Sequence, residues 1–247
     1  MQPRPLARPP IAEALVDLRV VNNPLVNAAL LEPIERKLAT GYPKFERPHS
    51  FQGTLKVEGD AVIADTKDLG FVGIVGKSSD RSRTAQFRKD GFTLNQLPPY
   101  PGGDSLLTEA IALWAVYRDV VKPDAVVRIA LRYIDRLELP YRAGDPFSRF
   151  LTAAPEMPAG APQEVASFLT RVVALDSDVP AVAIVTQKLE AKTEPTPADV
   201  VLDIDVFRQG DFRTDEATLR AELERLRELK NRIFFSLLTD AALELYL

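Results

Sequence analysis

Apolar and polar residues alternate along two segments of the chain, and we predict that both are strands with one buried face. In the first segment the apolar residues take the even-numbered positions: Ala12, Ala14, Val16, Leu18 and Val20. Glu13, Asp17 and Arg19 lie on the other side of the same predicted strand. A period of two is typical of a strand that covers a core with one face and meets water with the other.

The second segment, residues 126–140, repeats this alternation and carries a row of arginines. Arg128, Arg132 and Arg136 share one side of the predicted strand. The opposite side is apolar and consists of Val127, Ile129, Leu131 and Tyr133. Asp135 also falls on the apolar side, so either the strand ends there or a buried carboxylate needs a partner.

Three segments show helical spacing, at residues 25–39, 105–121 and about 214–238. In the second, Trp114 and Tyr117 belong to the apolar stripe, and we expect them in the core. The third helix is long, and its apolar stripe consists of Leu219, Leu223, Leu226, Ile233, Phe234 and Leu237.

Short strands fill most of the remaining chain. Residues 44–97 predict several of them, with a strong hairpin turn at Asp90-Gly91. Further strands are expected at residues 164–175, 180–192 and 199–208. Short turns between consecutive strands favour antiparallel pairing. We therefore predict an α+β fold, in which helices pack on one face of a curved antiparallel sheet and the chain ends in a long helix.

Proline content and the order of these elements suggest four parts. A flexible tail, residues 1–8, precedes an N-terminal α+β half at 9–141. A Pro-rich connector at 142–163, with a short helix near 146–153, leads to C-terminal strands and the long helix at 164–247. The length of the last helix favours one core shared by both halves.

Composition excludes several classes of protein. The 247 residues are 46% hydrophobic, which suffices for a core that needs no disulfide or metal cross-link. The chain has no Cys and one His, so disulfide scaffolds, thiolate zinc sites and His-rich metal clusters are excluded. Its net charge of −4 does not favour non-specific nucleic-acid binding. Without an apolar run of membrane-spanning length or a secretory signal, we expect no membrane association and a cytoplasmic location.

The arginine row is the leading candidate for a binding site. Three guanidinium groups in line suit a small anionic ligand, because each can hold oxygen atoms with two hydrogen bonds. The alternative is a ladder of ion pairs with carboxylates on neighbouring strands, which is ordinary sheet chemistry. The carboxylates available for such a ladder are Glu13, Asp17, Asp203 and Asp205.

The same carboxylates define a weaker candidate for a metal site. Asp203 and Asp205 lie about 7 Å apart on one strand face and could hold Mg²⁺ together with Glu13 or Asp17. No catalytic residue can be assigned. Gly76-Lys77-Ser78 lacks the earlier glycine of a P-loop, and the lone His49 has no recognisable nucleophile partner.

Several motifs resemble those of a sporadically distributed, uncharacterised prokaryotic protein family of about this length. They are Pro-Pro-Ile-Ala-Glu-Ala at 9–14, Leu-Arg-Tyr-Ile-Asp-Arg at 131–136, Leu-Asp-Ile-Asp at 202–205, and Phe234 followed by Thr239-Asp240. The family commonly has Asn where Asp135 stands here. The resemblance implies no known activity, but patchy distribution implies a gene that moves in cassettes such as defence or toxin–antitoxin islands.

Three functions remain open on these grounds. The first is a non-catalytic binding protein whose charged sheet face takes an anionic ligand or a partner protein. The second is a Mg²⁺-dependent enzyme that processes phosphate or nucleotide groups. The third is a scaffold that associates through the C-terminal helix. The absence of an identifiable nucleophile or metal cluster favours a protein without catalytic activity.

Overall fold

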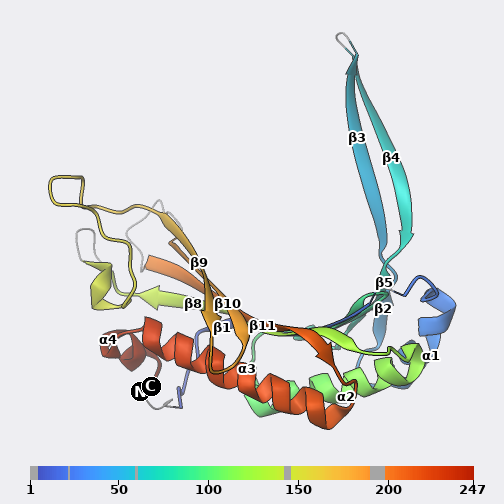
Figure 1. Ribbon diagram of the computed structural model, residues 1–247. Helices are drawn as coiled ribbons and strands as arrows, with labels where there is room; N and C mark the ends of the chain where they lie inside the picture. The colour runs from blue at the N-terminus through green and yellow to red at the C-terminus, as the bar shows by residue number, and fades with distance from the viewer. Residues whose placement is uncertain (1–4, 22, 59–60, 142–145, 190–197) are drawn as a thin grey trace.

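The fold is a curved antiparallel sheet, seen in a computed structural model that describes residues 5–21, 23–58, 61–141, 146–189 and 198–247. Nine strands of the described residues form this sheet (Figure 1). In spatial order they are β2 (Lys44–Glu46), β5 (Gly73–Lys77), β6 (Arg83–Arg88), β7 (Gly91–Gln96), β1 (Ile11–Val20), β8 (Val126–Leu139), β11 (Ala198–Phe212), β10 (Ala181–Leu189) and β9 (Phe168–Asp176). The predicted antiparallel sheet is confirmed.

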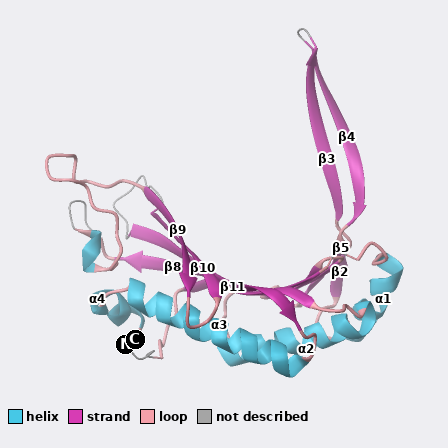
Figure 2. Ribbon diagram, in the orientation of Figure 1, coloured by secondary structure: helices cyan, strands magenta, loops and turns pink. Residues whose placement is uncertain are grey.

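The long helices lie along one face of this sheet, and its other face is left open (Figure 2). The helices within the described residues are α1 (Ala28–Leu38), α2 (Gly103–Val121), α3 (Glu216–Leu237) and α4 (Asp240–Leu243), with 3₁₀ turns at Phe147–Arg149 and Glu244–Tyr246. The α+β class, the helices on one face and the long C-terminal helix are therefore confirmed. Among the described residues, no helix combines the length and apolar character needed to span a bilayer.

The alternation in the sequence decides which face of the sheet is buried. Ala14, Val16 and Leu18 of β1 have no exposed surface, and they face the helices. Trp114 of α2 is equally buried, and its indole Nε1 donates a hydrogen bond to the Thr214 carbonyl at 2.9 Å. The predicted core positions of Trp114 and Tyr117 are thus confirmed.

Helix α3 packs its apolar stripe on the sheet of its own chain. Its start is fixed by Asp215, whose side chain accepts a hydrogen bond from the Thr218 backbone N–H at 2.9 Å. Leu219, Leu223 and Leu226 are fully buried, and each contributes about 1.5–3 kcal/mol relative to an exposed side chain. The stripe is therefore part of the core.

One pair of strands leaves the main sheet. β3 (His49–Glu58) and β4 (Ala61–Phe71) pair only with each other in the sheet topology, and the hairpin projects from one end of the molecule (Figure 1). Residues 70–76, Gly-Phe-Val-Gly-Ile-Val-Gly, have the composition of one continuous strand, but they do not form one. The chain breaks at Val72, because β4 continues the hairpin whereas β5 pairs with β2 and β6.

The N-terminal and C-terminal parts of the chain contribute to the same sheet. β8 pairs with β1 along one edge and with β11 along the other. The short helix expected near 146–153 is a single 3₁₀ turn, Phe147–Arg149. Residues 1–4 of the expected tail and 142–145 of the connector lie outside the described residues.

Candidate functional site

The open face of the sheet carries all seven charged residues that the sequence analysis selected. We call it the open face because helices cover only the other side (Figure 1). The arginine row of β8 lies there beside Glu13 and Asp17 of β1 and Asp203 and Asp205 of β11, as the strand register requires. The sequence pattern therefore brings these side chains together.

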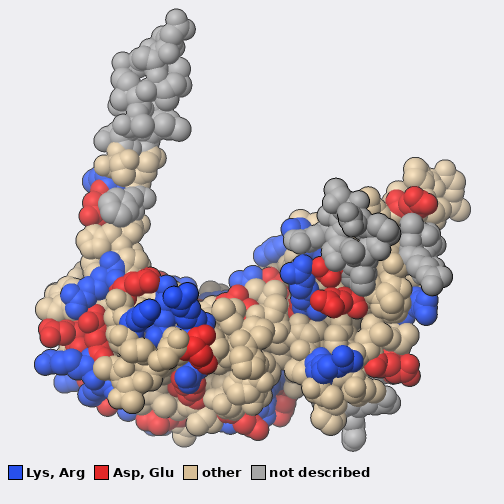
Figure 3. All heavy atoms as spheres, turned by 180° about the vertical axis from the view of Figure 1, so that it is seen from behind, with Lys and Arg blue, Asp and Glu red and all other residues tan. Residues whose placement is uncertain are grey.

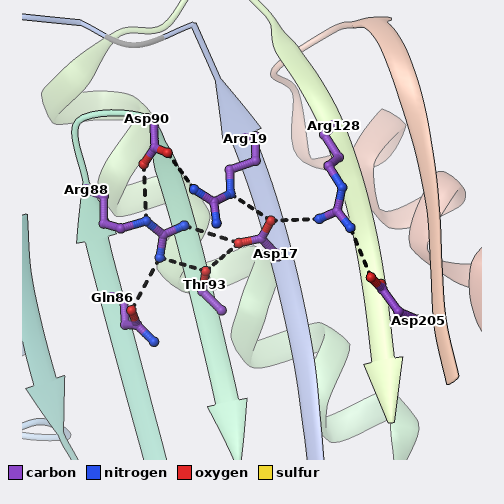
Figure 4. A network of polar contacts seen from close by, with 8 residues as sticks. All are labelled: Asp17, Arg19, Gln86, Arg88, Asp90, Thr93, Arg128 and Asp205. Carbon is purple, nitrogen blue, oxygen red and sulfur yellow. Dashed lines mark hydrogen bonds and ion pairs between the residues drawn. The ribbon is translucent and has the colours of Figure 1, made fainter. Parts of the chain in front are cut away.

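Asp17 is the centre of a hydrogen-bonded network whose members come from β1, β6, β7, β8 and β11 (Figure 4). It accepts hydrogen bonds from Thr93 Oγ1 at 2.6 Å, Arg19 Nε at 2.9 Å and Arg128 at 3.0 Å. Arg88 adds a fourth contact at 3.1 Å. A depression of about 310 Å³ lies over this network.

The carboxylates of the network respond differently to their surroundings. Burial opposes ionisation of Asp17, but the Thr93 hydrogen bond and the guanidinium groups of Arg19 and Arg88 outweigh it, so the pKa of Asp17 lies below its ordinary value. Burial raises the pKa of Asp205, although Arg128 and Arg132 act in the opposite direction. Asp17 therefore stays ionised at acidic pH.

The remaining arginines of the row are also paired with carboxylates. Arg132 donates two hydrogen bonds to Asp203, at 2.8 and 2.5 Å. Arg136 donates to Asp199 at 2.7 Å. Asp199 was not among the predicted partners, because the sequence does not reveal the register between β8 and β11.

Glu13 lies on the open face but has an uncharged partner. It accepts a hydrogen bond from Asn95 Nδ2 at 2.5 Å. Asp203 and Asp205, the two residues considered for Mg²⁺, are bonded to Arg132 and Arg128. No cluster of three or more potential metal ligands occurs among the residues that the structure describes.

Charges of both signs are interspersed over the side of the molecule that Figure 3 shows. In the depression and its margin, Arg19, Arg88, Arg128 and Arg132 are all bonded to carboxylates. The carboxylates that they contact are Asp17, Asp90, Asp203 and Asp205. Four positive charges thus meet four negative ones, and the network is neutral.

An apolar patch continues the open face at the β9 edge of the sheet. Leu169, Val173 and Leu175 point to this face, because they pair with Lys188, Ile184 and Val182 of β10. The exposed Arg171 lies between Leu169 and Val173 on the same side of the strand. Their exposed fractions are 68%, 54% and 81%. We call these three residues the edge patch. A strand was expected at residues 164–175, and β9 lies there. Its position at the edge of the sheet was not predicted, because periodicity does not reveal the order of strands.

A second candidate site lies on the helix side of the sheet. A cavity of about 720 Å³ opens between β8, the second half of α3 and the N-terminal segment that leads into β1. We call it the helix-side pocket. Its polar lining residues are Tyr100, Asp104, Tyr133, Asp135, Arg227, Lys230 and Asn231.

Asp135 is the buried carboxylate that the alternation of β8 indicated. It is only 2% exposed, and its Oδ2 has no hydrogen-bond partner among the described residues. Burial raises the pKa of Asp135 to about 7, against the opposing influence of the Lys230 charge. Such an orphaned acceptor costs about 1–3 kcal/mol, and more when it is ionised.

Lys230 is the second unusual group of the pocket. It is 8% exposed, and its Nζ atom lies 3.9 Å from the centroid of the Tyr133 ring. Burial lowers the pKa of Lys230 to about 8, although Asp135 acts in the opposite direction. No sequence pattern marks Lys230, because it lies in a helix rich in charged residues.

Other polar groups of the pocket are held in place by protein partners. The hydroxyls of Tyr100 and Tyr133 lie 2.6 Å apart. Arg227 donates to Asp104 at 2.6 Å and forms an ion pair with Glu224 at 2.7 Å. Asp135 and Lys230 are therefore the pocket's least satisfied charges.

No protein-family model matches this chain, and comparison with curated proteins finds no relative.

Proposed function

We propose that this protein is a non-catalytic interaction module that binds a partner protein on its open face. The observation that carries the proposal is the combination of a neutral, internally bonded charge network with an exposed apolar edge patch on the same face. Such a surface resembles the polar and apolar parts of a protein–protein interface. We place its action in the cytoplasm, and the family resemblance supports a role within a mobile gene cassette.

The neutral network favours a protein over an anionic ligand. Arg128 and Arg132 already donate to aspartates, so a phosphate or carboxylate ligand would have to displace those groups. A protein surface can instead add hydrogen bonds at the margins of the network without breaking it. The arginine row then contributes specificity and orientation.

The edge patch supplies the apolar contact area that such a complex needs. Exposed apolar side chains that lie next to one another mark interaction surfaces more often than isolated ones do. β9 also ends the sheet, so it leaves one row of backbone groups outside the ladder. The partner therefore meets side chains and an unpaired strand edge together.

The projecting β3–β4 hairpin is a further reason to expect a partner. Two-stranded hairpins are marginally stable alone in water. This one stands clear of the helices and the main sheet (Figure 1). A partner bound along the open face would reach toward its base.

The other two functions receive less support. A Mg²⁺-dependent reaction would require Asp203 and Asp205 to exchange arginine partners for a metal. A scaffold built on α3 would have to use its polar side, because Leu219, Leu223 and Leu226 are buried in the core.

Affinity capture of the tagged full-length chain from its own host tests the proposal. The wild type is compared with the double variant Val173→Glu/Leu175→Glu and with Arg132→Glu, after circular dichroism has shown that each variant is folded. Val172→Glu is the matched control, because Val172 is 58% exposed on the opposite face of the same strand. Light scattering reports self-association of each protein.

We expect one protein in near-stoichiometric amount with the wild type and with the control. Its affinity should fall at least about tenfold in the double variant, because charges would enter an apolar contact. Arg132→Glu should also lose binding, because it reverses a charge of the arginine row, and unchanged binding by this variant contradicts the proposal. Equal recovery by all four proteins, or equal loss in the control, contradicts the proposal. Recovery of no stoichiometric protein by any of them contradicts it as well.

A further inference from the structure

The helix-side pocket lies on the opposite side of the sheet from the surface proposed to bind a partner, and it has the dimensions of a ligand site. Its volume of about 720 Å³ falls within the range of about 300–1,000 Å³ that is usual for small-molecule pockets. Its apolar lining residues are Pro5, Leu6, Pro9, Pro10, Ile11, Phe234 and Phe235. An apolar wall with a few polar groups is the common composition of such sites.

Two buried groups of opposite charge line this pocket without contacting each other. Asp135 is 2% exposed and Lys230 is 8% exposed. Within the described part of the chain, no hydrogen bond or ion pair joins their side chains. Two opposite charges that share a cavity but remain apart leave room for a molecule that bonds to both.

We propose that the helix-side pocket binds a small zwitterion with an apolar side chain, namely a free α-amino acid or a short peptide. The ammonium group of the ligand faces Asp135, and its carboxylate faces Lys230. The apolar side chain packs on the wall formed by the prolines and by Phe234 and Phe235. The ligand is neutral as a whole, as the pair of pocket charges requires.

The surroundings of Lys230 support this orientation. Its Nζ atom lies over the face of the Tyr133 ring at 3.9 Å, which restrains the ammonium group but leaves it without a carboxylate. Arg227 also lines the pocket and is held by Asp104 at 2.6 Å. The carboxylate of the ligand therefore meets two cationic side chains, and its ammonium group meets the free oxygen of Asp135.

Calorimetric titration of the full-length wild type tests the charge complementarity directly. The probes are L-phenylalanine and the dipeptide L-phenylalanyl-L-leucine. Two blocked analogues serve as controls: N-acetyl-L-phenylalanine lacks the ammonium group, and L-phenylalanine amide lacks the carboxylate. We expect at least one zwitterion to bind about tenfold or more tightly than both blocked analogues. The tighter of the two zwitterions shows whether the ligand is an amino acid or a peptide.

Variants link the binding to the pocket. Asp135→Asn and Lys230→Met should each weaken the zwitterion about tenfold or more, because each leaves one end of the ligand uncompensated. Arg132→Glu, on the open face, is the matched control and should bind like the wild type. The comparison of zwitterions with blocked analogues uses only the wild type, so it tests the inference even if a variant does not fold.

Three results would overturn the inference. They are no binding of either zwitterion up to roughly 10 mM, equal binding of the blocked analogues, and unchanged binding in both folded pocket variants. The inference does not depend on the proposed partner protein. Loss of partner capture with intact zwitterion binding contradicts only the proposed function, and the reverse result contradicts only this inference.

Discussion

Removing the charge at the centre of the open face should destabilise the fold by a calculable amount. Asp17 accepts four hydrogen bonds, and its side chain is 14% exposed. An Asp17→Asn substitution keeps the shape but removes the charge and part of the acceptor capacity. Breaking a buried ion pair costs about 3–5 kcal/mol. The cost is smaller here because Arg88 retains Asp90 and Arg128 retains Asp205.

We therefore expect Asp17→Asn to lower the free energy of unfolding by about 2–4 kcal/mol at pH 7. Urea denaturation followed by circular dichroism measures it. Asp119→Asn is the control, because Asp119 is 55% exposed and contacts Arg118 at the surface. That change should stay within about 0.5 kcal/mol of the wild type.

The pH dependence provides a second check on the same residue. The folded pKa of Asp17 lies below its value in the unfolded chain, so the stabilisation is fully present above about pH 4. It is lost as the pH falls through the folded pKa. The difference between wild type and Asp17→Asn should thus be constant from pH 5 to 7 and shrink below about pH 4. A difference under about 1 kcal/mol at pH 7, or one that does not shrink at all as the pH falls below 4, would refute the reasoning.

Three further predictions concern stability. Gly91→Ala should lower the free energy of unfolding by at least about 2 kcal/mol in thermal melts, because Gly91 has φ +144° and an added Cβ would lie 2.1 Å from the Leu18 carbonyl oxygen. Gly41→Ala is the control and should be neutral, because open space surrounds Gly41. The free energy of unfolding of Asp135→Asn should rise relative to that of the wild type by up to about 4 kcal/mol between about pH 4 and pH 7, because a raised folded pKa makes the wild type lose stability as the pH rises. A difference in urea denaturation that stays the same over this pH range would disprove this prediction. Leu226→Ala should cost about 2–5 kcal/mol at every protein concentration, whereas a concentration-dependent loss would instead indicate an interface through α3.

Much of the fold was predictable because periodicity reports which face of an element is buried. The alternation in β1 and β8 alone predicts that Asp17 and Arg128 lie on the polar sides of their strands. Helix α3 ends at Leu237, one residue before the predicted end at Leu238. These features depend on local spacing, which the sequence contains in full.

The partners of each strand were not predictable in the same way. Residues 70–76 read as one apolar run, yet Phe71 belongs to the projecting hairpin and Gly73 to the main sheet. An added Cβ at Gly73 would lie 2.2 Å from the Phe87 carbonyl oxygen, a requirement visible only when the two strands are side by side. Periodicity identifies faces, whereas neighbours depend on long-range topology.

The same limit applied to the candidate sites. The pairing of Arg136 with Asp199 follows from the register of β8 and β11, not from any motif. The helix-side pocket joins Asp135 to Lys230, which lies 95 positions later in the chain. A carboxylate at an apolar strand position was the one local signal of that pocket.

The central place of β1 has a consequence for how the chain folds during synthesis. β1 is made first among the strands, yet it pairs with β7 and β8, which begin at Gly91 and Val126. Ribosomes add about 5–20 residues per second, so β1 waits about 6–23 s before β8 begins to appear. The edge of β1 that pairs with β8 stays without its partner for that time. This makes the nascent N-terminal segment a natural substrate for chaperones and the long-range pairing of β1 a slow step in folding.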